Sequence, residues 1–458
     1  MCRISQEAIS AILKKGKIYE VGGAVRDRLL GRKIDVKDRD YLVCGIPYGE
    51  LSDILKKHGQ VDLVGRSFGV IKFTQFRDDR KYTFDVALPR KEFSTGVGHR
   101  EFSVEFDPAL KVENDLLRRD FTINAMAVAL DSSEFVDPFD GRRDLSKRII
   151  RMVSPESFPE DPLRMLRAIQ FAARFEFTIE PETFRAIIRH SGLIKSVSPE
   201  RISEELNKLL VLADRPSIGF RLMHETGLLK QILPEMEEMV NVHQPGGYHK
   251  YDVFEHTLHT VDAAPKVLQI RLAALFHDIA KPQTKRALEE EGKATFYGHE
   301  KIGARTALRV MKRLRYSNDM IRAVVILVDK HMFTTAVTDK GMRRLIRRVG
   351  QDLIFNLLDL RRADVVAQGM GGQTDDVDEF ERQIRDELER KPPFSIKDLV
   401  INGHDLMSVF NLPQSAIIGE VLNYLLEKVL DDPGDNEREK LLAFARLYLE
   451  SRKQENKP

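Results

Sequence analysis

The sequence predicts a small α/β head, a mixed sheet with helices, followed by a long all-α remainder. Before about residue 150, short runs alternate apolar and polar residues, whereas afterwards apolar residues recur at helical spacing. The 458 residues are also too many for one hydrophobic core, so about three or four domains are expected.

The predicted strands come first along the chain, and the predicted helices follow. Strands are predicted at KIYEV (17–21), DYLVCG (40–45), GVIKFTQF (69–76) and YTFDVALP (82–89). Helices are predicted at 161–175, 199–213 and 414–430. Proline and glycine interrupt the pattern near 241–252 and 389–395, where we expect domains to separate.

The net charge of +2 is nearly neutral, so a polyanion site requires local clusters of Lys and Arg. Residues 343–350 and 312–315 are basic, and residues 374–389 are acidic. A single charged run is more often a solvated helix face than a binding patch, and we prefer that interpretation for each run.

Cysteine content and hydropathy indicate the compartment. Only Cys2 and Cys44 are present, which gives no disulfide framework and suits a reducing environment. The sequence shows neither a signal segment nor an apolar run of about 20 residues. We therefore expect a cytoplasmic protein without a membrane partner; the oligomeric state stays open.

Two aspartates one residue apart, Asp38 and Asp40, begin the second predicted strand. Alternate strand residues point to the same face, so the two carboxylates are expected side by side while Arg39 points away. Like charges this close need a cation, and hard oxygen ligands suit Mg²⁺, which commonly joins carboxylates to substrate phosphates. A DxD by itself is more often a surface turn.

A glycine turn lies just upstream of these aspartates. Gly22 and Gly23 end one predicted strand and open the helix of AVRDRLLG (24–31). Backbone N–H groups at a helix start, with Arg26 one turn in, suit an anion. Combined with the metal site, this arrangement fits a nucleoside triphosphate.

A third carboxylate, Asp85, lies inside the last predicted strand, where an unpaired acid is costly. It either completes the metal site or forms a salt bridge with a nearby arginine. Both interpretations are kept.

Five motifs follow one another in roughly the first 215 residues. They are VGGAVRDRLLG with DRD (21–40), RRDFTINAMA (118–127), DPFDGRRDL (137–145), EDPLRMLRA (160–168) and SPERISEEL (198–206). In order and spacing they resemble the motifs of class II tRNA nucleotidyltransferases, a family that includes CCA-adding enzymes and bacterial poly(A) polymerases. Residues 394–410 more weakly resemble the tRNA-gripping tail of that family.

The resemblance implies Mg²⁺ as cofactor, tRNA, CTP and ATP as partners, and a role for each motif. The residues so assigned are Asp38 and Asp40 for the catalytic metals; Gly23 and Arg26 for the triphosphate; Arg119, Asp120 and Asn124 for the sugar and phosphate; and Asp161, Arg164 and Arg167 for the base. The residue pattern itself adds Gly22 to the triphosphate turn and Asp85 to the catalytic candidates.

The EDPLR segment suggests why such an enzyme needs no nucleic-acid template. Pro162 is favoured at the first helical position, so Asp161 and Arg164 are expected on one face of a helix start. Asp accepts and Arg donates hydrogen bonds, which matches cytosine and adenine but opposes uracil and guanine. Without the resemblance, a helix salt bridge between the two side chains is the alternative.

A second constellation of His and Asp lies in the middle of the chain. Its motifs, EHTLH (255–259), FHDIAKP (276–282), YGHE (297–300), DKH (329–331) and RRAD (361–364), resemble the HD phosphohydrolase fold. The resemblance implies a divalent metal (Mg, Mn, Ni or Fe) at His256, His277, Asp278 and Asp364, with His299 and His331 at a phosphate or second metal. An inactive helical bundle is the alternative.

Three functions stay open at this point. The first is addition of CCA, or of CC or A alone, to tRNA; the second is poly(A) synthesis; the third is HD phosphohydrolysis with an RNA-binding head. The Phe-Gly-Val in LVGRSFGVIKF (63–73) favours the first, and a flexible loop at 91–115 is expected to govern which nucleotides are added. The expected domains are a nucleotidyltransferase head (1–145), a neck and body (146–240), an HD domain (241–390) and a tRNA-binding tail (391–458).

Overall fold

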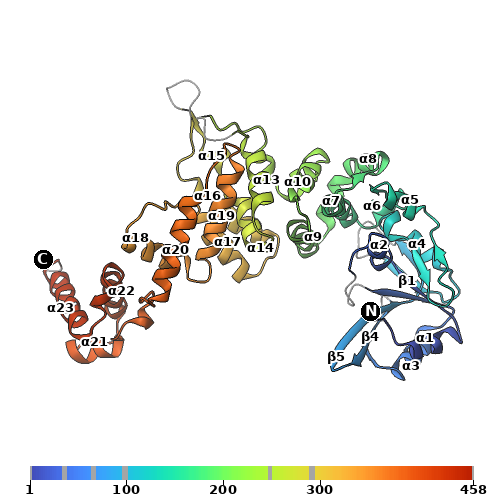
Figure 1. Ribbon diagram of the computed structural model, residues 1–458, viewed down its shortest axis with the longest axis horizontal. Helices are drawn as coiled ribbons and strands as arrows, with labels where there is room; N and C mark the ends of the chain where they lie inside the picture. Colours follow the sequence, from blue (N-terminus) through green and yellow to red (C-terminus); the bar gives the residue numbers. More distant parts are fainter. Residues whose placement is uncertain are drawn as a thin grey trace. The chain divides into compact units, whose positions relative to one another are not determined.

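A computed structural model describes residues 3–33, 39–62, 69–94, 102–245, 250–287 and 294–455. The chain divides into two compact units (Figure 1). Unit 1 comprises residues 1–237 with 313–315, and unit 2 comprises residues 238–312 with 316–458. The predicted division into four domains stays a prediction.

Unit 1 begins with a seven-stranded mixed sheet in the order β3-β4-β5-β2-β1-β8-β9. Its strands are β1 (Lys17–Val21), β2 (Asp40–Cys44), β3 (Gln60–Asp62), β4 (Val70–Arg77), β5 (Arg80–Ala87), β8 (Ala127–Ala129) and β9 (Phe135–Val136). Strands β2 and β5 are parallel, and the other neighbours are antiparallel. The four strands predicted from alternation are confirmed.

Both faces of the sheet are covered, because alternate strand residues enter two different cores. Tyr41 of β2 belongs to a core that includes residues of α1 (Gln6–Leu13) and α3 (Tyr48–Lys56). The next residue, Leu42, belongs to a second core with residues of α4 (Val112–Leu117). The sheet therefore stands between helices, with its ends free to present polar side chains.

The segment predicted as a loop at 91–115 contains regular structure. Strands β6 (Arg90–Ser94) and β7 (Phe102–Phe106) pair as a separate antiparallel hairpin. Helix α4 begins at Val112, within the same range. The loop prediction was therefore wrong for these residues, since the alternation of 102–106 had not been recognised as a strand.

The remainder of unit 1 is mostly helical. Its helices are α5 (Gly141–Ser146), α6 (Ser157–Glu160), α7 (Leu163–Phe175), α8 (Pro181–His190), α9 (Pro199–Leu212), α10 (Pro216–Glu225), α11 (Leu228–Ile232) and α12 (Pro234–Glu237), and the short strands β10 (Ile149–Ile150) and β11 (Thr178–Ile179) pair beside them. Helix α7 packs against α9 and α10. The helices predicted at 161–175 and 199–213 are confirmed, although Pro162 caps α7 rather than occupying its first helical position.

The described residues of unit 2 are mostly helical and include one small strand pair, β12 (Arg286–Ala287) with β13 (Ala294–Thr295). Its helices are α13 (Val253–Ala263), α14 (Leu268–Phe276), α15 (Lys281–Thr284), α16 (His299–Arg313), α17 (Asn318–Lys330), α18 (Asp339–Val349), α19 (Ile354–Ala367), α20 (Asp375–Glu389), α21 (Gly403–Phe410), α22 (Ala416–Asp431) and α23 (Arg438–Glu455). Helices α13, α14, α17 and α19 pack together (Figure 1). None of the helices in the described part of the chain combines the length and apolar character needed to cross a bilayer.

The basic run at 343–350 lies on α18 and is not a solvated face, so that interpretation was wrong. Arg343 is only 7% exposed; it pairs with Glu387 of α20 and donates to carbonyl oxygens at the end of α22. Arg347 pairs with Glu427 of α22. Arg343 thus joins the basic run to the acidic run on α20, whereas Arg347 pairs outside the acidic run, and a count of charges along the sequence reveals neither contact.

Candidate active site

Asp40 and Asp85 lie side by side at one end of the sheet of unit 1. Asp40 begins β2, and Asp85 is its partner in the parallel register between β2 and β5. Asp38 lies outside the described residues. Nζ of Lys72 is 3.2 Å from Oδ1 of Asp85, so the salt-bridge partner is a lysine rather than the expected arginine. Asp40 and Asp85 together offer oxygen donors of the kind that Mg²⁺ prefers.

Arg39 is buried, whereas Asp40 beside it is exposed, which agrees with the predicted alternation. The guanidinium of Arg39 is 2% exposed and donates to Glu20 of β1. Glu20 is fully buried and also pairs with Arg28 of α2 (Gly23–Leu29). This glutamate therefore ties the strand that carries Asp40 to the helix that follows the glycine turn. It had not been predicted, because one acid in an alternating strand is normally expected to face solvent.

The glycine turn brings three predicted nucleotide-binding residues together. Gly22 has φ +72° and caps α2 (Gly23–Leu29). This positive φ favours glycine, and a Cβ on Gly22 would lie 2.3 Å from Nη1 of Arg119. Arg26 is 5% exposed, and its Nη1 donates to Oδ1 of Asn124 over 2.6 Å.

Asp120 connects this turn to the helical part of unit 1. Its carboxylate accepts from Nδ2 of Asn124 and from Nε of Arg167, each over 2.9 Å. Burial acts to raise the pKa of Asp120, but the Arg167 guanidinium and the Asn124 amide outweigh it and hold the pKa below its ordinary value. Arg167 also pairs with Glu205 of α9. The predicted sugar-phosphate residues and one predicted base reader thus form one network.

Asp161 and Arg164 do not share one face of a helix, and that expectation was wrong. Asp161 has an extended backbone before α7, and its Oδ2 lies 2.8 Å from Nη2 of Arg201. Arg164, in the first turn of α7, donates to the carbonyl oxygen of Arg118 over 2.7 Å and pairs with Glu160. Each of the two predicted base readers therefore has its own partner. Arg201 had not been predicted, although it stands in the SPERISEEL motif.

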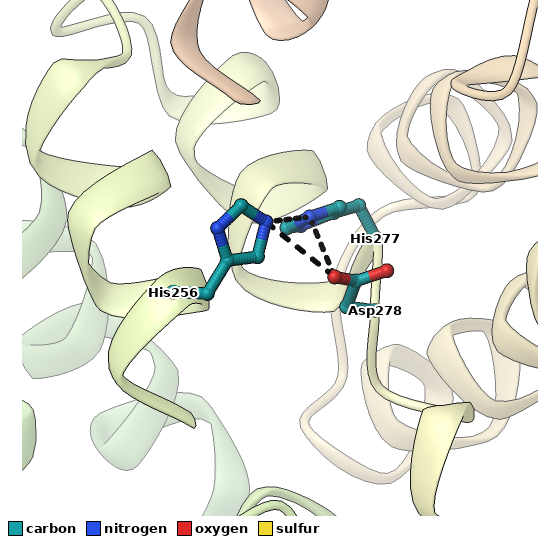
Figure 2. A group of neighbouring side chains, drawn as sticks. All are labelled: His256, His277 and Asp278. Atoms are coloured by element: carbon teal, nitrogen blue, oxygen red, sulfur yellow. Dashed lines mark hydrogen bonds and ion pairs between the residues drawn. The ribbon is translucent and has the colours of Figure 1, made fainter. Parts of the chain in front are cut away.

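In unit 2, the four predicted metal ligands converge, and Figure 2 shows three of them, His256, His277 and Asp278. His256 lies on α13, His277 and Asp278 follow α14, and Asp364 lies on α19. Nε2 of His256 is 3.4 Å from Nε2 of His277 and 3.0 Å from Oδ1 of Asp364. Nε2 of His277 is 3.2 Å from Oδ2 of Asp278. All four side chains are buried.

His299 and His331 extend this cluster on the other side of Asp278. Nε2 of His299 lies 3.2 Å from Nε2 of His331 and 3.4 Å from Oδ1 of Asp278. The ligand atoms of these three residues lie within 4.8 Å of one another. Asp278 thus faces both groups. We call the six converging side chains the His/Asp cluster, which consists of His256, His277, Asp278, His299, His331 and Asp364.

The imidazole tautomers of the His/Asp cluster favour a metal. Each of the four imidazoles has its Nδ1 near a backbone carbonyl oxygen. The distances are 3.4 Å for His256 to Ala367, 2.8 Å for His277 to Ala274, 2.8 Å for His299 to Phe296 and 2.8 Å for His331 to Val328. A neutral imidazole that donates from Nδ1 keeps a lone pair on Nε2. The Nε2 atoms therefore meet one another and the carboxylates as electron-pair donors, which fits a divalent transition metal.

Electrostatics in the His/Asp cluster follow from burial and from its internal charges. Burial acts to raise the pKa of Asp278, but His277 and Lys281 outweigh it and hold the pKa well below its ordinary value. Burial lowers the pKa of His331 to about 3, helped by the neighbouring His277. Burial also opposes a charged His277, yet Asp278 raises the pKa of that ring. A bound cation would replace the proton of His277.

A cavity of about 600 Å³ opens beside the cluster, and two cations line it. Nζ of Lys281 is 2.7 Å from Oδ2 of Asp278 and 2.7 Å from Oε1 of Gln244. Nη1 of Arg361 is 3.1 Å from Oδ2 of Asp364. Neither cation had been predicted as a site residue, although both lie within the motifs FHDIAKP and RRAD.

Three family models match the chain. The "Poly A polymerase head domain" matches residues 18–151, the "Probable RNA and SrmB-binding site of polymerase A" matches residues 176–240, and "tRNA nucleotidyltransferase domain 2" matches residues 289–445. The first match contains both the glycine turn and the paired carboxylates, and the third contains part of the His/Asp cluster.

Curated relatives and solved structures agree with these matches. The Multifunctional CCA protein of Alkalilimnicola ehrlichii is 39% identical over 309 residues, which cover 65% of this chain and 70% of that protein. The protein of the same name from Xanthomonas oryzae pv. oryzae is 37% identical over 364 residues, covering 77% and 82%. The crystal structure of the Bacillus stearothermophilus CCA-adding enzyme in complex with CTP has the same fold, with a TM-score of 0.71 at 23% identity over 99% of this chain and 100% of that one. The chain therefore belongs to the family of poly(A) polymerases and CCA-adding enzymes, and it is a nucleotidyltransferase.

Proposed function

We propose that this nucleotidyltransferase adds CCA to the 3′ ends of tRNA from CTP and ATP without a nucleic-acid template. Its relatives named Multifunctional CCA protein support this activity. The observation that carries the proposal is the register of Asp40 with Asp85, which sets two carboxylates side by side on the strands next to the glycine turn. A poly(A) polymerase, or an enzyme that adds only CC or only A, is the alternative within the family.

Asp40 and Asp85, together with Asp38, would hold Mg²⁺ in unit 1. When bound, Mg²⁺ supplies the charge that activates the 3′ hydroxyl and stabilises the leaving pyrophosphate. The chain itself supplies Lys72 at Asp85, which reduces repulsion between the two carboxylates before a cation arrives. The buried Glu20 keeps the metal strand and the phosphate helix in a fixed relation.

The triphosphate would lie at Gly22 and Gly23, within reach of Arg26 and Arg119. Arg119 fills the space that a side chain on Gly22 would occupy, which brings its guanidinium to the turn. Asn124 orients both arginines from the protein side, because its Oδ1 accepts from Arg26 and its backbone carbonyl oxygen accepts from Arg119. Asp120 in turn accepts from the Asn124 amide. Triphosphate binding therefore draws on two guanidinium groups whose positions beside the turn exist before the nucleotide enters.

Asp161, Arg164 and Arg167 would choose the base. Arg201 orients the carboxylate of Asp161 as an acceptor, and the Arg118 carbonyl orients Arg164 as a donor. This pattern accepts the amino group and ring nitrogen of cytosine and adenine and opposes uracil and guanine. Arg167, which pairs with Asp120, links base choice to the sugar end of the pocket.

The His/Asp cluster in unit 2 would be a second, metal-dependent phosphohydrolase site. Its residues would hold one or two divalent ions, and a bound metal lowers the pKa of a water ligand. Hydrolysis of a 2′,3′-cyclic phosphate adds water oxygen to phosphorus, breaks one ribose P–O bond and leaves the water proton on the released ribose oxygen. Because a cyclic end blocks nucleotide addition, this reaction would repair damaged tRNA. A catalytically inactive cluster and a hydrolase with a merely RNA-binding head are the alternatives.

The proposal also assigns parts of the chain. Residues 1–145 would form the catalytic head, 146–240 the base-reading neck and body, 241–390 the HD domain, and 391–458 a tRNA-binding tail. The free Cys44, whose pKa burial raises to about 12, suits a reducing cytoplasm.

Incubation with three tRNA substrates tests the first activity. Purified protein is given tRNA that ends before CCA, before the terminal A, or after it, with CTP and ATP supplied separately. We expect CTP to extend only the first substrate and ATP only the second. Long A tails on all three would instead establish the poly(A) polymerase.

A further inference from the structure

Two phenylalanine rings of α7 lie against guanidinium groups of the candidate site in unit 1. Cζ of Arg26 is 5.2 Å from the ring centre of Phe171 and 4.8 Å from that of Phe175. Cζ of Arg167 is 5.3 Å from the ring centre of Phe171. A cation this close to an aromatic face is attracted by the negative charge of the π system. Phe171 therefore contacts arginines from two parts of the proposed pocket, the triphosphate end and the base end.

The spacing of residues along α7 explains this arrangement. Arg167, Phe171 and Phe175 follow one another at intervals of four residues, so their side chains lie on one face of the helix. The two rings stack, with centres 5.7 Å apart and planes inclined by 7°. Both rings and Arg26 are buried, and a desolvated cation is held more strongly by a ring than an exposed one.

The rings complete the set of contacts that hold Arg26. Its Nε donates to Oδ1 of Asp27 over 2.8 Å, and its Nη1 donates to Oδ1 of Asn124 over 2.6 Å. These hydrogen bonds act in the plane of the guanidinium and leave its faces to the rings. The remaining nitrogen, Nη2, lies nearest Gly23, because a Cβ built there would be 3.5 Å from Nη2 and 3.9 Å from Cζ and from Nη1. The rings thus help to fix the nitrogen that meets an anion at the glycine turn.

Arg167 is held in the same manner. Its Nε donates to Oδ2 of Asp120 over 2.9 Å, its Nη1 lies 3.4 Å from Oε1 of Glu205, and its face lies over Phe171. Phe121 stands edge-on to Phe171, with ring centres 5.9 Å apart and planes at 89°, which fixes the orientation of the shared ring. One oriented ring therefore contacts both guanidinium groups.

We infer that Phe171 is a positioning residue of the nucleotide site. Its ring holds the guanidinium groups of Arg26 and Arg167 by their faces, so one apolar side chain sets both the triphosphate contact and the base contact. Phe175 supports the triphosphate contact, since its ring lies against Arg26, whereas Arg167 lies over Phe171. The inference rests on the proposed nucleotide addition and deepens it with a residue that offers the nucleotide no polar group.

Leucine variants test the contact with Arg26, because leucine retains apolar volume but has no π face. CTP is titrated calorimetrically into the full-length protein with Mg²⁺, and inorganic triphosphate is then used as its competitor, so that only the shared site is measured. Phe171→Leu and Phe175→Leu should each weaken triphosphate binding about fivefold, since both rings contact Arg26. Wild-type affinity for triphosphate in Phe171→Leu would overturn this half of the inference.

Selectivity tests the contact with Arg167. Addition to tRNA lacking CCA is measured over a range of CTP and of UTP concentrations. Phe171→Leu should raise the KM for CTP about tenfold and keep kcat within about twofold, because a binding contact is lost. Its preference in kcat/KM for CTP over UTP should fall about fivefold, whereas Phe175→Leu should keep the wild-type preference. Wild-type preference in Phe171→Leu would overturn the second half.

Fluorination tests the π face without removing the ring. Phenylalanines with one, two and three ring fluorines at position 171 have progressively weaker negative faces, so the KM for CTP should rise stepwise. Phe220→Leu is the matched control, because Phe220 is fully buried on α10, which also packs against α7. It should lower the stability and leave the KM for CTP unchanged. A flat fluorine series, or an equal rise in KM in Phe220→Leu, would show that Phe171 acts through packing alone.

Binding separates this inference from the function on which it rests. If wild type binds CTP but extends none of the tRNA substrates, the proposed CCA addition fails, and the competition with triphosphate still decides the role of Phe171. If wild type adds CCA and the leucine and fluorinated variants match it in affinity and selectivity, the function stands and the positioning role is refuted. A wild type that binds no nucleoside triphosphate would overturn both.

Discussion

The two candidate sites are built in different ways. In unit 1, the carboxylates of Asp40 and Asp85 are set by the register of two adjacent strands. In unit 2, the His/Asp cluster is buried and gathers side chains from helices separated by more than a hundred residues of sequence, such as His256 and Asp364. Strand register positions the carboxylates of unit 1 without burying them. Helix packing in unit 2 buries the charged side chains, and buried carboxylates favour the binding of a cation.

This difference predicts that the sites fail independently. A change at the sheet should affect nucleotide addition alone, and a change in the cluster should affect only hydrolysis. A variant that lost both activities while folded would show that the sites act as one.

Asp40→Ala is expected to have the largest effect. Nucleotide addition should fall at least about a thousandfold, because a metal ligand is lost where charge develops. Hydrolysis of adenosine 2′,3′-cyclic phosphate should be unchanged. Single-turnover addition of CMP to tRNA lacking CCA measures the first effect, and folding is checked by circular dichroism. Near wild-type addition would remove Asp40 from the catalytic assignment.

The double change His277→Ala with Asp278→Ala is the reciprocal test. It removes two ligands of the cluster, so bound divalent metal and hydrolysis of the cyclic nucleotide should both fall to background. Addition of CTP and ATP should stay within about twofold of wild type, as expected for substitutions at a distant independent site. Metal analysis of the dialysed protein is the direct measurement. Hydrolysis that survives the double change would place that activity elsewhere.

Asp120→Asn tests the network that joins the turn to the helical part of unit 1. Loss of the buried carboxylate leaves the half-buried Arg167 with one acid fewer, so the variant should lose about 3 kcal/mol of stability. Because the folded pKa of Asp120 lies below its ordinary 3.8, the stabilisation is present above about pH 4 and is lost as pH falls through the folded pKa. Hydrogen exchange of unit 1 peptides between pH 3 and 7 measures it. Asp131→Asn, at an exposed position, should change little; equal exchange in both variants would contradict the network.

Asp161→Ala is expected to have the smallest effect. Addition should persist at a reduced rate, while discrimination of CTP and ATP against UTP and GTP should decline by about 1 to 3 kcal/mol, or about 5- to 150-fold. Competition between CTP and UTP on one tRNA measures the ratio. The matched change Arg201→Lys should lower discrimination less, since it disturbs only the partner of Asp161. Unchanged selectivity in Asp161→Ala would show that the carboxylate serves the ion pair alone.

Local patterns were sufficient for the elements and for the order of the motifs. Apolar patterning identified β1 and β2 as strands, although both faces of each strand are buried and the burial therefore shows no period of two. Helical spacing identified α7 and α9. The same patterns missed β6 and β7 and placed Asp161 inside a helix, since element ends depend on capping and on neighbouring contacts.

The sequence by itself determined which residue types this protein has for chemistry, and in what order: a glycine turn, paired aspartates, an EDPLR segment and a series of His and Asp. Only the tertiary structure decided their partners. Three ion pairs show this: Lys72 with Asp85, Arg201 with Asp161, and Lys281 with Asp278. Judged from the sequence alone, each of these acids could pair with many basic residues. Packing selects one partner for each charge, because the free-energy cost of leaving a charge unpaired depends on which residues meet in the folded chain. Such contacts leave no periodic pattern in the sequence.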